Sequence, residues 1–347
     1  MASGAPTPPL HDRFCVRRSS TMTVATAPKV DLERFQEEGY LVVEHVLDIE
    51  QDLEPVVAEY MALLDEVAER WYAEGRIRST YADLPFHERL ARVLTDAGPG
   101  SYQPFDISLP FSGVTEQTPI HLGPAVFNLL TSPRLIDVIE QFIGPEILSN
   151  PIQHVRIKPP EHLLPSSFHS SLVGRTDWHQ DQGVALPEVD ETEMLTVWIP
   201  VTDATEENGC LCVIPGSHRR GLVTHCPGKP GRPGLHIPEE LRGPFALPVP
   251  IKRGSVLFLH RLTMHASLPN RSNGVRWSFD LRYQPIGQPT GRPWFPAFVV
   301  RSRAHPELEV HDWRVWADLW RATRSRLTAH PPEGKFNRWT GTEPVCA

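Results

Sequence analysis

The chain has 347 residues, a net charge of −8 and an apolar fraction of 40%. That fraction is enough for a large core, and an acidic chain without a long basic stretch is not expected to have nucleic acid as its main partner. No run of about 18 apolar residues occurs, so the sequence predicts no membrane span. The 36 prolines are about twice the average frequency, which favours many loops and few long helices.

Residues 1–28 carry arginine, serine and proline but lack the apolar run of a secretory signal, so we expect a disordered tail. Met22 is an alternative start, and the sequence leaves open which methionine begins the protein. We expect residues 29–347 to form one domain with three parts. These are a helical part at about 29–150, a strand-rich core at about 151–285 and a tryptophan-rich extension at 286–347.

The first part shows the apolar spacing and capping residues of helices. A capped helix is predicted at 31–38, a strand at 40–46 and a long amphipathic helix at 48–72. Another helix is predicted at 134–143, because Ser132 can act as its N-cap, Pro133 suits its first turn and Gly144 can end it.

From residue 152 the pattern changes to short strands separated by glycine and proline, which favours a jelly roll. Strands are predicted at 152–158, 194–200, 254–260 and 276–283, and Asn208-Gly209 predicts a tight turn. Residues 219–243 are rich in proline and glycine and read as a lid or binding loop. A last helix is predicted at 311–328, with Trp313, Trp316 and Trp320 on one buried stripe.

The five cysteines are few and odd in number, so we expect no disulfide framework and a reducing, cytoplasmic location. Cys210 and Cys212 fall in an apparent strand on the same face, which favours packing over metal binding. Cys226, His225 and His236 match no standard zinc spacing, so we do not expect a zinc site there.

His179 and Asp181 stand two residues apart, and His265 follows a strand further along the chain. Two imidazoles and one carboxylate can occupy one face of an octahedral Fe(II) and leave three positions open. A lone His-x-Asp pair is weak evidence, because chance alone supplies such triplets. The signal gains weight because all three residues flank predicted strands, which can aim them at one point.

Arg276 follows His265 by 11 residues and starts a strand. Its planar guanidinium can grip a carboxylate at two points, which suits an oxo-acid co-substrate bound beside the metal. Ser278 lies two residues on, so it shares the strand face of Arg276 and can donate a second hydrogen bond to the same carboxylate.

These segments, with 208–218 and the N-terminal stretch 35–43, resemble the phytanoyl-CoA dioxygenase family of Fe(II)/2-oxoglutarate oxygenases over roughly residues 31–285. The resemblance implies a double-stranded β-helix (jelly roll, cupin-like) core that is mostly β with flanking helices. It also implies Fe(II), 2-oxoglutarate and O2, with ascorbate as an optional reductant, and hydroxylation coupled to release of succinate and CO2.

The resemblance also implies site residues. His179, Asp181 and His265 would hold the iron, and Arg276 with Ser278 would hold the far carboxylate of 2-oxoglutarate. Further co-substrate contacts are expected from Trp198, Lys158 and Gln153, and Gln180 is expected to face substrate or co-substrate. Related halogenating enzymes replace the iron-binding carboxylate by a small residue, so Asp181 favours hydroxylation over halogenation.

The substrate cannot be read from the sequence. We expect a small molecule, either free, carrier-bound or an acyl-CoA, and the oligomeric state stays open. The basic residues of 219–243 could dock a phosphate, although a solvated loop is the simpler interpretation. Two rival classes remain, namely a non-redox cupin-like isomerase, lyase or sensor and an inactive binding module. Arg276 and Ser278 argue against the first, and the intact ligand set argues against the second.

Overall fold

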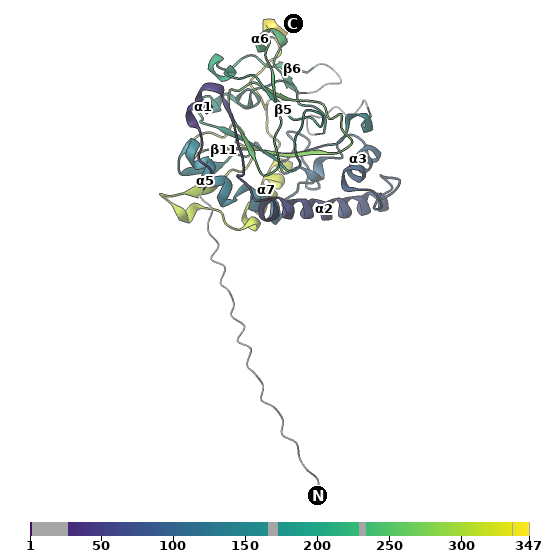
Figure 1. The fold of residues 1–347 in the computed structure, drawn as a ribbon. Helices are drawn as coiled ribbons and strands as arrows, with labels where there is room; N and C mark the ends of the chain where they lie inside the picture. The colour runs from purple at the N-terminus through teal and green to yellow at the C-terminus, as the bar shows by residue number, and fades with distance from the viewer. Residues whose placement is uncertain (2–26, 166–172, 229–233, 335, 347) are drawn as a thin grey trace.

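The computed structural model describes residues 1, 27–165, 173–228, 234–334 and 336–346. The predicted N-terminal tail falls almost entirely on residues 2–26, which lie outside these ranges. The described part is built on two antiparallel sheets, with helices on one side of the larger sheet (Figure 1).

The larger sheet runs in the order β1 (Tyr40–Val43), β9 (Val256–His260), β4 (Leu195–Pro200), β11 (Arg276–Pro285), β2 (Glu146–Ser149), β12 (Phe298–Ser302), and β3 (His154–Lys158) also pairs with β11. The smaller sheet is β10 (His265–Ser267), β5 (Leu211–Val213), β8 (Leu247–Val249). A cluster of buried side chains from β4, β9, β5 and β8 lies between the two sheets. This arrangement confirms the predicted jelly-roll core.

Strand alternation divides the larger sheet into two chemically different faces. The odd-numbered residues Trp277, Phe279 and Leu281 of β11 join the main apolar core under the helices. The even-numbered residues Arg276 and Arg282 of the same strand are equally buried but point to the opposite face. The polar face therefore looks into the space between the sheets.

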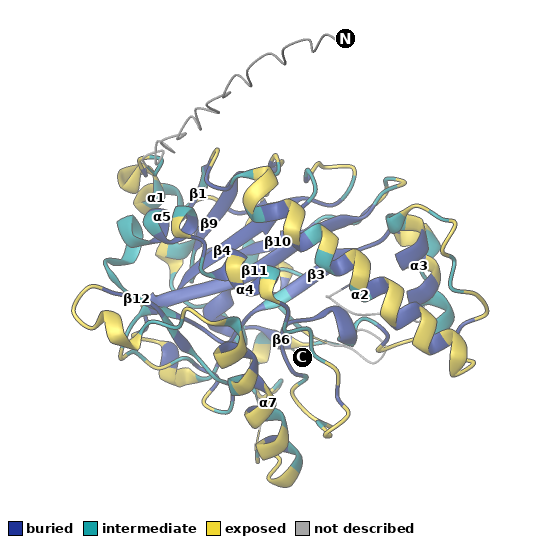
Figure 2. Ribbon diagram, turned by 90° about the horizontal axis from the view of Figure 1, so that it is seen from below, coloured by how far each residue is buried: buried dark blue, intermediate teal, exposed yellow. Residues whose placement is uncertain are grey.

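The helices cover the apolar face of the larger sheet, and α2 and α4 cross in front of its strands in Figure 2. They are α1 (Leu32–Glu38), α2 (Glu54–Ala73), α3 (Phe86–Ala97), α4 (Pro124–Leu130), α5 (Pro133–Ile143) and α7 (Trp313–Ala329), and a π-helical turn, Ile49–Leu53, precedes α2. The short helix α6 (Glu239–Arg242) lies on the opposite side of the molecule (Figure 1). No helix in the described part of the chain is long and apolar enough to cross a membrane.

The predicted helices at 31–38, 48–72, 134–143 and 311–328 are all present, with ends shifted by a few residues. Trp316 and Trp320 are buried on one face of α7 as predicted, whereas Trp313 at the start of the helix is only half-buried. Helices α3 and α4 were not predicted, and α4 is too short for apolar periodicity to reveal it. The strand predicted at 40–46 ends at Val43, because the chain turns at His45, where φ is +56°.

The tight turn predicted at Asn208-Gly209 is present, although only β5 flanks it directly. Gly209 has φ +93°, and a Cβ there would lie 2.6 Å from the Leu268 carbonyl oxygen. Only glycine satisfies both conditions. The turn brings β5 alongside β10, which carries His265.

The described residues of the segment 219–243 contain more regular structure than the predicted loop. They form a short hairpin of β6 (Cys226–Pro227) and β7 (Leu235–His236), followed by α6. The hairpin and α6 lie near the C-terminus, on the side of the molecule away from α2 and α7 (Figure 1).

A disulfide joins Cys226 to Cys346 across 120 positions of sequence. The prediction that the cysteines form no disulfides is therefore wrong for this pair, because the fold brings together two residues that the sequence keeps far apart. Cys210 and Cys212 are free and buried, and burial raises the pKa of these thiols to about 11 and about 12. Both thiols stay protonated and pack, as predicted. The cytoplasmic location remains a prediction.

Breaking this bond should destabilise the protein. Cross-linking so long a loop restricts the unfolded chain, which typically contributes about 2–4 kcal/mol. We expect Cys346→Ser to lower the free energy of unfolding by about that amount under oxidising conditions. A reductant should bring the wild type down to the variant and leave the variant unchanged. Denaturant unfolding with and without reductant measures both, and equal stability of the four samples would contradict the prediction.

Candidate active site

The three predicted metal ligands meet between the sheets. His265 begins β10, and His179 pairs with it through two backbone hydrogen bonds of 3.0 and 2.9 Å. Asp181 starts a 3₁₀ turn, Asp181–Val184, directly after His179. The His179 Nε2 atom lies 3.7 Å from Asp181 Oδ1, and His265 Nε2 lies 4.0 Å from Asp181 Oδ2. One ligand atom from each residue falls within 4.8 Å of the others, which suits a single bound metal ion.

Backbone contacts prepare both imidazoles for metal binding. The Nδ1 atom of His179 is 2.8 Å from the Asp177 carbonyl oxygen, and that of His265 is 3.0 Å from the Thr263 carbonyl oxygen. A protonated Nδ1 that donates to a carbonyl leaves Nε2 as the free lone pair. Burial, followed by the nearby His265, holds the pKa of His179 well below its ordinary value. The neutral form is the one that binds metals.

Asp181 is held by two side chains that the sequence analysis did not assign. Arg282 on β11 forms a buried ion pair with it, and the Thr196 hydroxyl on β4 donates to its other oxygen. Burial alone would raise the pKa of this carboxyl. The opposing effect of Arg282 and the two histidines is larger, so the pKa lies well below its ordinary value. Asp181 is therefore an ionised ligand in a fixed orientation.

Removing Arg282 should leave a buried carboxylate without its cation. Breaking one partner of a buried pair typically costs about 3–5 kcal/mol. We expect Arg282→Gln to destabilise the metal-free protein by about that amount. The loss should be smaller with Zn(II) bound, because the ion supplies the missing positive charge. Thermal unfolding of metal-free and Zn(II)-loaded samples tests this, with Arg301→Gln in a half-exposed ion pair as the control. Equal losses in both states would contradict the expectation.

Arg276 lies on the same face of β11 and is fully buried. Its Nη1 donates to Ser278 Oγ at 2.5 Å, while Nε and Nη2 find no hydrogen-bond partner among the described residues. The guanidinium also lies 5.5 Å from the ring centre of Trp198. Burial lowers its pKa to about 10, so it stays charged. Two unpaired donor nitrogens on a buried cation fit the carboxylate of a co-substrate.

Ser278 is oriented by its neighbours. Its hydroxyl accepts from Arg276 and lies 3.3 Å from Asp280 Oδ1. Asp280 in turn forms a buried ion pair with Arg156 on β3. Burial raises the pKa of Asp280, but Arg156 and Arg282 bring it down to about 2. A connected polar network therefore runs along the inner face of β11.

Lys158 sits opposite Arg276 across the β3–β11 pair and is 1% exposed. Its ammonium donates to Ser267 Oγ at 2.6 Å and to Thr176 Oγ1 at 3.1 Å. Burial, followed by the charges of Arg276 and Arg156, lowers its pKa well below the ordinary value. Gln153 precedes β3 and donates to the Ile107 carbonyl oxygen at 2.8 Å instead, so the structure does not bring it to the metal triad.

The expectation that Gln180 faces substrate or co-substrate is wrong. Its side-chain amide donates to the carbonyl oxygens of Gly221 and Leu262 and accepts from Val223 N at 2.9 Å. Neighbouring residues of an extended segment point to opposite sides. Since His179 and Asp181 point inward, Gln180 must point outward, into the segment 219–243.

The C-terminal segment supports the same turn from outside. Trp339 Nε1 donates to the Gly183 carbonyl oxygen at 2.7 Å, and its ring stacks on His225 with centres 5.3 Å apart. The His225 Nε2 atom accepts from Gln180 N at 2.9 Å. His225 therefore connects Cys226, its neighbour in the chain, to the backbone between two metal ligands.

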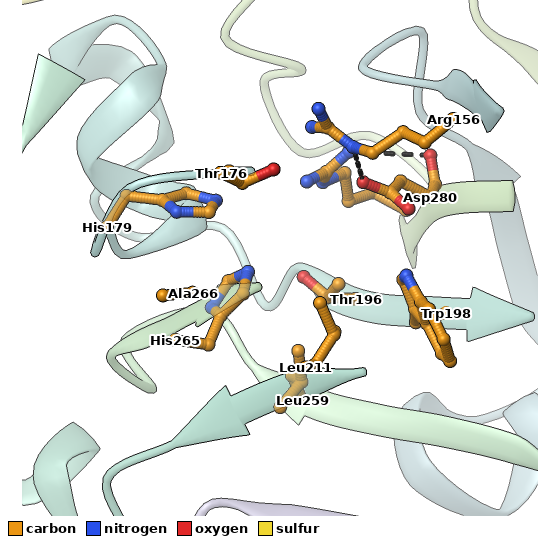
Figure 3. Close-up of a pocket in the computed structure, with 11 residues that line it drawn as sticks. Arg156, Thr176, His179, Thr196, Trp198, Leu211, Leu259, His265, Ala266 and Asp280 are labelled. Atoms are coloured by element: carbon orange, nitrogen blue, oxygen red, sulfur yellow. Dashed lines mark hydrogen bonds and ion pairs between the residues drawn. The ribbon is translucent and has the colours of Figure 1, made fainter. Parts of the chain in front are cut away.

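Figure 3 shows the pocket at the triad, with the rings of His179 and His265 facing Thr196, Trp198 and the Arg156–Asp280 pair. Side chains from both sheets line it, and its cavity is about 10 Å³. That is room for about one water, and the lining includes Arg156 and Arg282.

A second, larger cavity of about 530 Å³ adjoins this pocket, and Thr176 and Ala266 line both. The segment 219–243 contributes Gly228, Gly234 and Arg242 to its wall. The inserted segment therefore borders a cavity next to the metal triad, which is consistent with the predicted binding loop. That it selects the substrate remains a prediction.

A family model for phytanoyl-CoA dioxygenase (PhyH) matches residues 35–278 of the chain, a span that contains the triad, Arg276 and Ser278. The chain belongs to the phytanoyl-CoA dioxygenase family. Members are Fe(II)- and 2-oxoglutarate-dependent enzymes, and the triad and the unpaired Arg276 fit these two cofactors. The rival assignment to a non-redox cupin is not supported.

Relatives of this family member include L-proline trans-4-hydroxylase of Streptomyces griseoviridis, 25% identical over 53% of this chain and 71% of the relative. Phytanoyl-CoA dioxygenase domain-containing protein 1 of Bos taurus is 24% identical over 76% of this chain and 91% of the relative. Human peroxisomal phytanoyl-CoA dioxygenase is 25% identical, but the match spans only 43% of its length and 44% of this chain.

Among solved structures, the apo form of the non-heme monooxygenase ThoJ is 19% identical, with a TM-score of 0.49 over 86% of this chain and 99% of ThoJ. The α-ketoglutarate-dependent epimerase SnoN is 21% identical, with a TM-score of 0.44 over 75% of this chain and 84% of SnoN.

Proposed function

We propose that this phytanoyl-CoA dioxygenase family member hydroxylates an unactivated carbon of a small metabolite or natural-product intermediate, with release of succinate and CO2 from 2-oxoglutarate. The observation that carries the proposal is Arg276, a fully buried cation with two nitrogen atoms, Nε and Nη2, left without an acceptor in the described structure. A merely structural arginine in this position would be expected to have a carboxylate partner.

Each residue has a part in the proposal. His179, Asp181 and His265 would hold Fe(II), which supplies the oxygen activation when bound. Arg276 and Ser278 would hold the far carboxylate of 2-oxoglutarate, and Lys158 would add a further contact from β3, opposite Arg276. The ring of Trp198 packs beside the guanidinium of Arg276.

Asp181 also bears on the type of oxidation. Its carboxylate is ionised and fixed by Arg282 and Thr196, so it would keep one coordination position of the iron. One position cannot hold both a carboxylate and a halide, which favours hydroxylation over halogenation. We also propose that residues 29–347 act as one domain, because a continuous apolar core joins residues from Val30 to Leu327.

The test is an anaerobic titration with Fe(II) and 2-oxoglutarate, followed by metabolite screening for succinate-coupled turnover. We expect a 2-oxoglutarate complex that forms only with metal, and an oxidised product that carries one added oxygen atom. A protein that binds metal but shows no metal-dependent 2-oxoglutarate binding would refute the assignment. A product that has lost two hydrogens, or has closed a ring, would retain the cofactors but replace hydroxylation by another oxidation.

A further inference from the structure

The space between the sheets carries more positive than negative charge. Three buried arginines, Arg156, Arg276 and Arg282, surround two buried carboxylates, Asp181 and Asp280. Fe(II) and the dianion of 2-oxoglutarate would cancel each other, so the assembled site would keep one positive charge from its arginines. Buried charge without compensation is costly. The site therefore favours a further anion near it.

The cavity of about 530 Å³ has room for that anion. It touches the iron pocket at Thr176 and Ala266, and its wall includes Ser267, which accepts from Lys158. Its volume lies within the range of small-molecule sites. A molecule seated there would reach the iron pocket with one end and the outer wall of the cavity with the other.

Arg242 of α6 lines the outer wall of this cavity. Its guanidinium lies 5.9 Å from the ring centre of Trp178, which also lines the cavity. Its Nε is buried and has no acceptor among the described residues, and its nearest carboxylate is the exposed Glu239, 3.8 Å away. Stacking on a tryptophan fixes a guanidinium without using its N–H groups.

The other charged residues of the cavity lining are Arg175 and Asp177. Arg175 lines the same cavity and is exposed, and His236 lies on the hairpin side, whereas Asp177 is the carboxylate of the described lining. By contrast, Arg219 and Arg220 of the inserted segment do not line the cavity, and they donate to the backbone carbonyl oxygens of Glu37 and Arg242. The positive charge that faces the cavity therefore comes mainly from Arg242 and Arg175.

We propose that the outer cavity is the substrate site and takes a molecule with an anionic group, a carboxylate or a phosphate, which Arg242 and Arg175 bind while the carbon to be oxidised points to the triad. This inference rests on the proposed function, since it places a substrate beside the iron pocket. The two arginines are specificity-determining residues and take no part in holding metal or 2-oxoglutarate.

The experiment compares matched pairs of probes on the Zn(II)-loaded protein saturated with 2-oxoglutarate, so that the anion sites beside the metal are occupied. The probes are 3-phenylpropanoate with 3-phenylpropanamide, and phenyl phosphate with phenol. Saturation-transfer NMR and calorimetry give their dissociation constants. We expect at least one anion to bind more tightly than its neutral partner, and the preferred anion identifies the substrate as a carboxylic acid or a phosphate ester.

Variants locate the site. Arg242→Gln should weaken binding of the preferred anion about tenfold or more, because a charge-assisted contact is lost, and should leave the neutral probe unchanged. Arg242→Lys should keep part of the preference, and the exposed Arg175→Gln should reduce it without disturbing α6. Arg76→Gln is the matched control, since Arg76 also stacks on a tryptophan, Trp71, but does not line the cavity.

Equal binding of acids and neutral partners, an Arg242→Gln variant with unchanged anion affinity, or no probe binding at millimolar concentration would each overturn the proposal. The same samples report 2-oxoglutarate binding separately. If 2-oxoglutarate fails to bind the metal-loaded wild type, the proposed function fails. If it binds and the anion preference is absent, only the substrate inference fails.

Discussion

Replacing His179, Asp181 or His265 by alanine should abolish turnover and weaken metal binding. Loss of a residue that only supports a ligand costs about 10–100-fold in metal affinity or activity, so loss of a ligand itself should cost more. The three ligand atoms converge within 4.8 Å, and removing one destroys the face that leaves three positions open. Fe(II) titration and succinate release measure the two effects.

A nearby histidine supplies the control. His260 ends β9, and its Nδ1 accepts from Leu262 N at 3.1 Å. It is not one of the converging groups, so His260→Ala should retain metal binding and most of the activity. A triad variant that keeps full activity would remove that residue from the ligand set. Loss of metal binding in His260→Ala, with the fold intact, would show that the ligands were assigned wrongly.

Arg276→Ala should raise the KM for 2-oxoglutarate strongly while the protein still binds iron. A charge-assisted, two-point contact contributes about 1.5–3 kcal/mol, which corresponds to roughly tenfold or more in affinity. Arg276→Lys should rescue binding only in part, because lysine keeps the charge but lacks the planar fork. Steady-state kinetics at varied 2-oxoglutarate, with Fe(II) binding measured alongside, separate the two effects.

Arg253→Ala is a suitable control for this prediction. Arg253 pairs with Glu54 at 2.9 Å in a half-exposed position, so its loss should change the KM for 2-oxoglutarate little. An unchanged KM in Arg276→Ala would eliminate Arg276 as the co-substrate anchor. A variant that also lost iron would point to a general structural role instead.

Much of the core and the ligand set could be predicted because they depend on local patterns. Period-two alternation revealed β4, β9 and β11, and it placed Ser278 on the face of Arg276. The same alternation, continued two and four residues beyond Ser278, would have placed Asp280 and Arg282 on this face as well. It would also have placed Arg156 beside Lys158 on β3, since both are even-numbered and face the site.

Other features could not be predicted because they depend on contacts between distant segments. Thr196 donates to Asp181 only because β4 pairs with β11. The outward contacts of Gln180 require the inserted segment to pack behind the metal-bearing turn. The larger cavity likewise exists only where residues near 176, 237 and 267 come together. The periodicity of a single segment carries no information about such contacts between distant segments.

The Cys226–Cys346 bond forms under oxidising conditions, whereas an Fe(II) site needs reducing ones. Cys226 is next to His225, which holds the backbone between His179 and Asp181, so the cross-link braces the iron-binding turn from behind. Iron must be ferrous for this chemistry, and surroundings that keep iron ferrous also tend to reduce disulfides. The redox balance around the protein thus decides whether its metal site is braced by a covalent link or only by the Trp339 stack and hydrogen bonds.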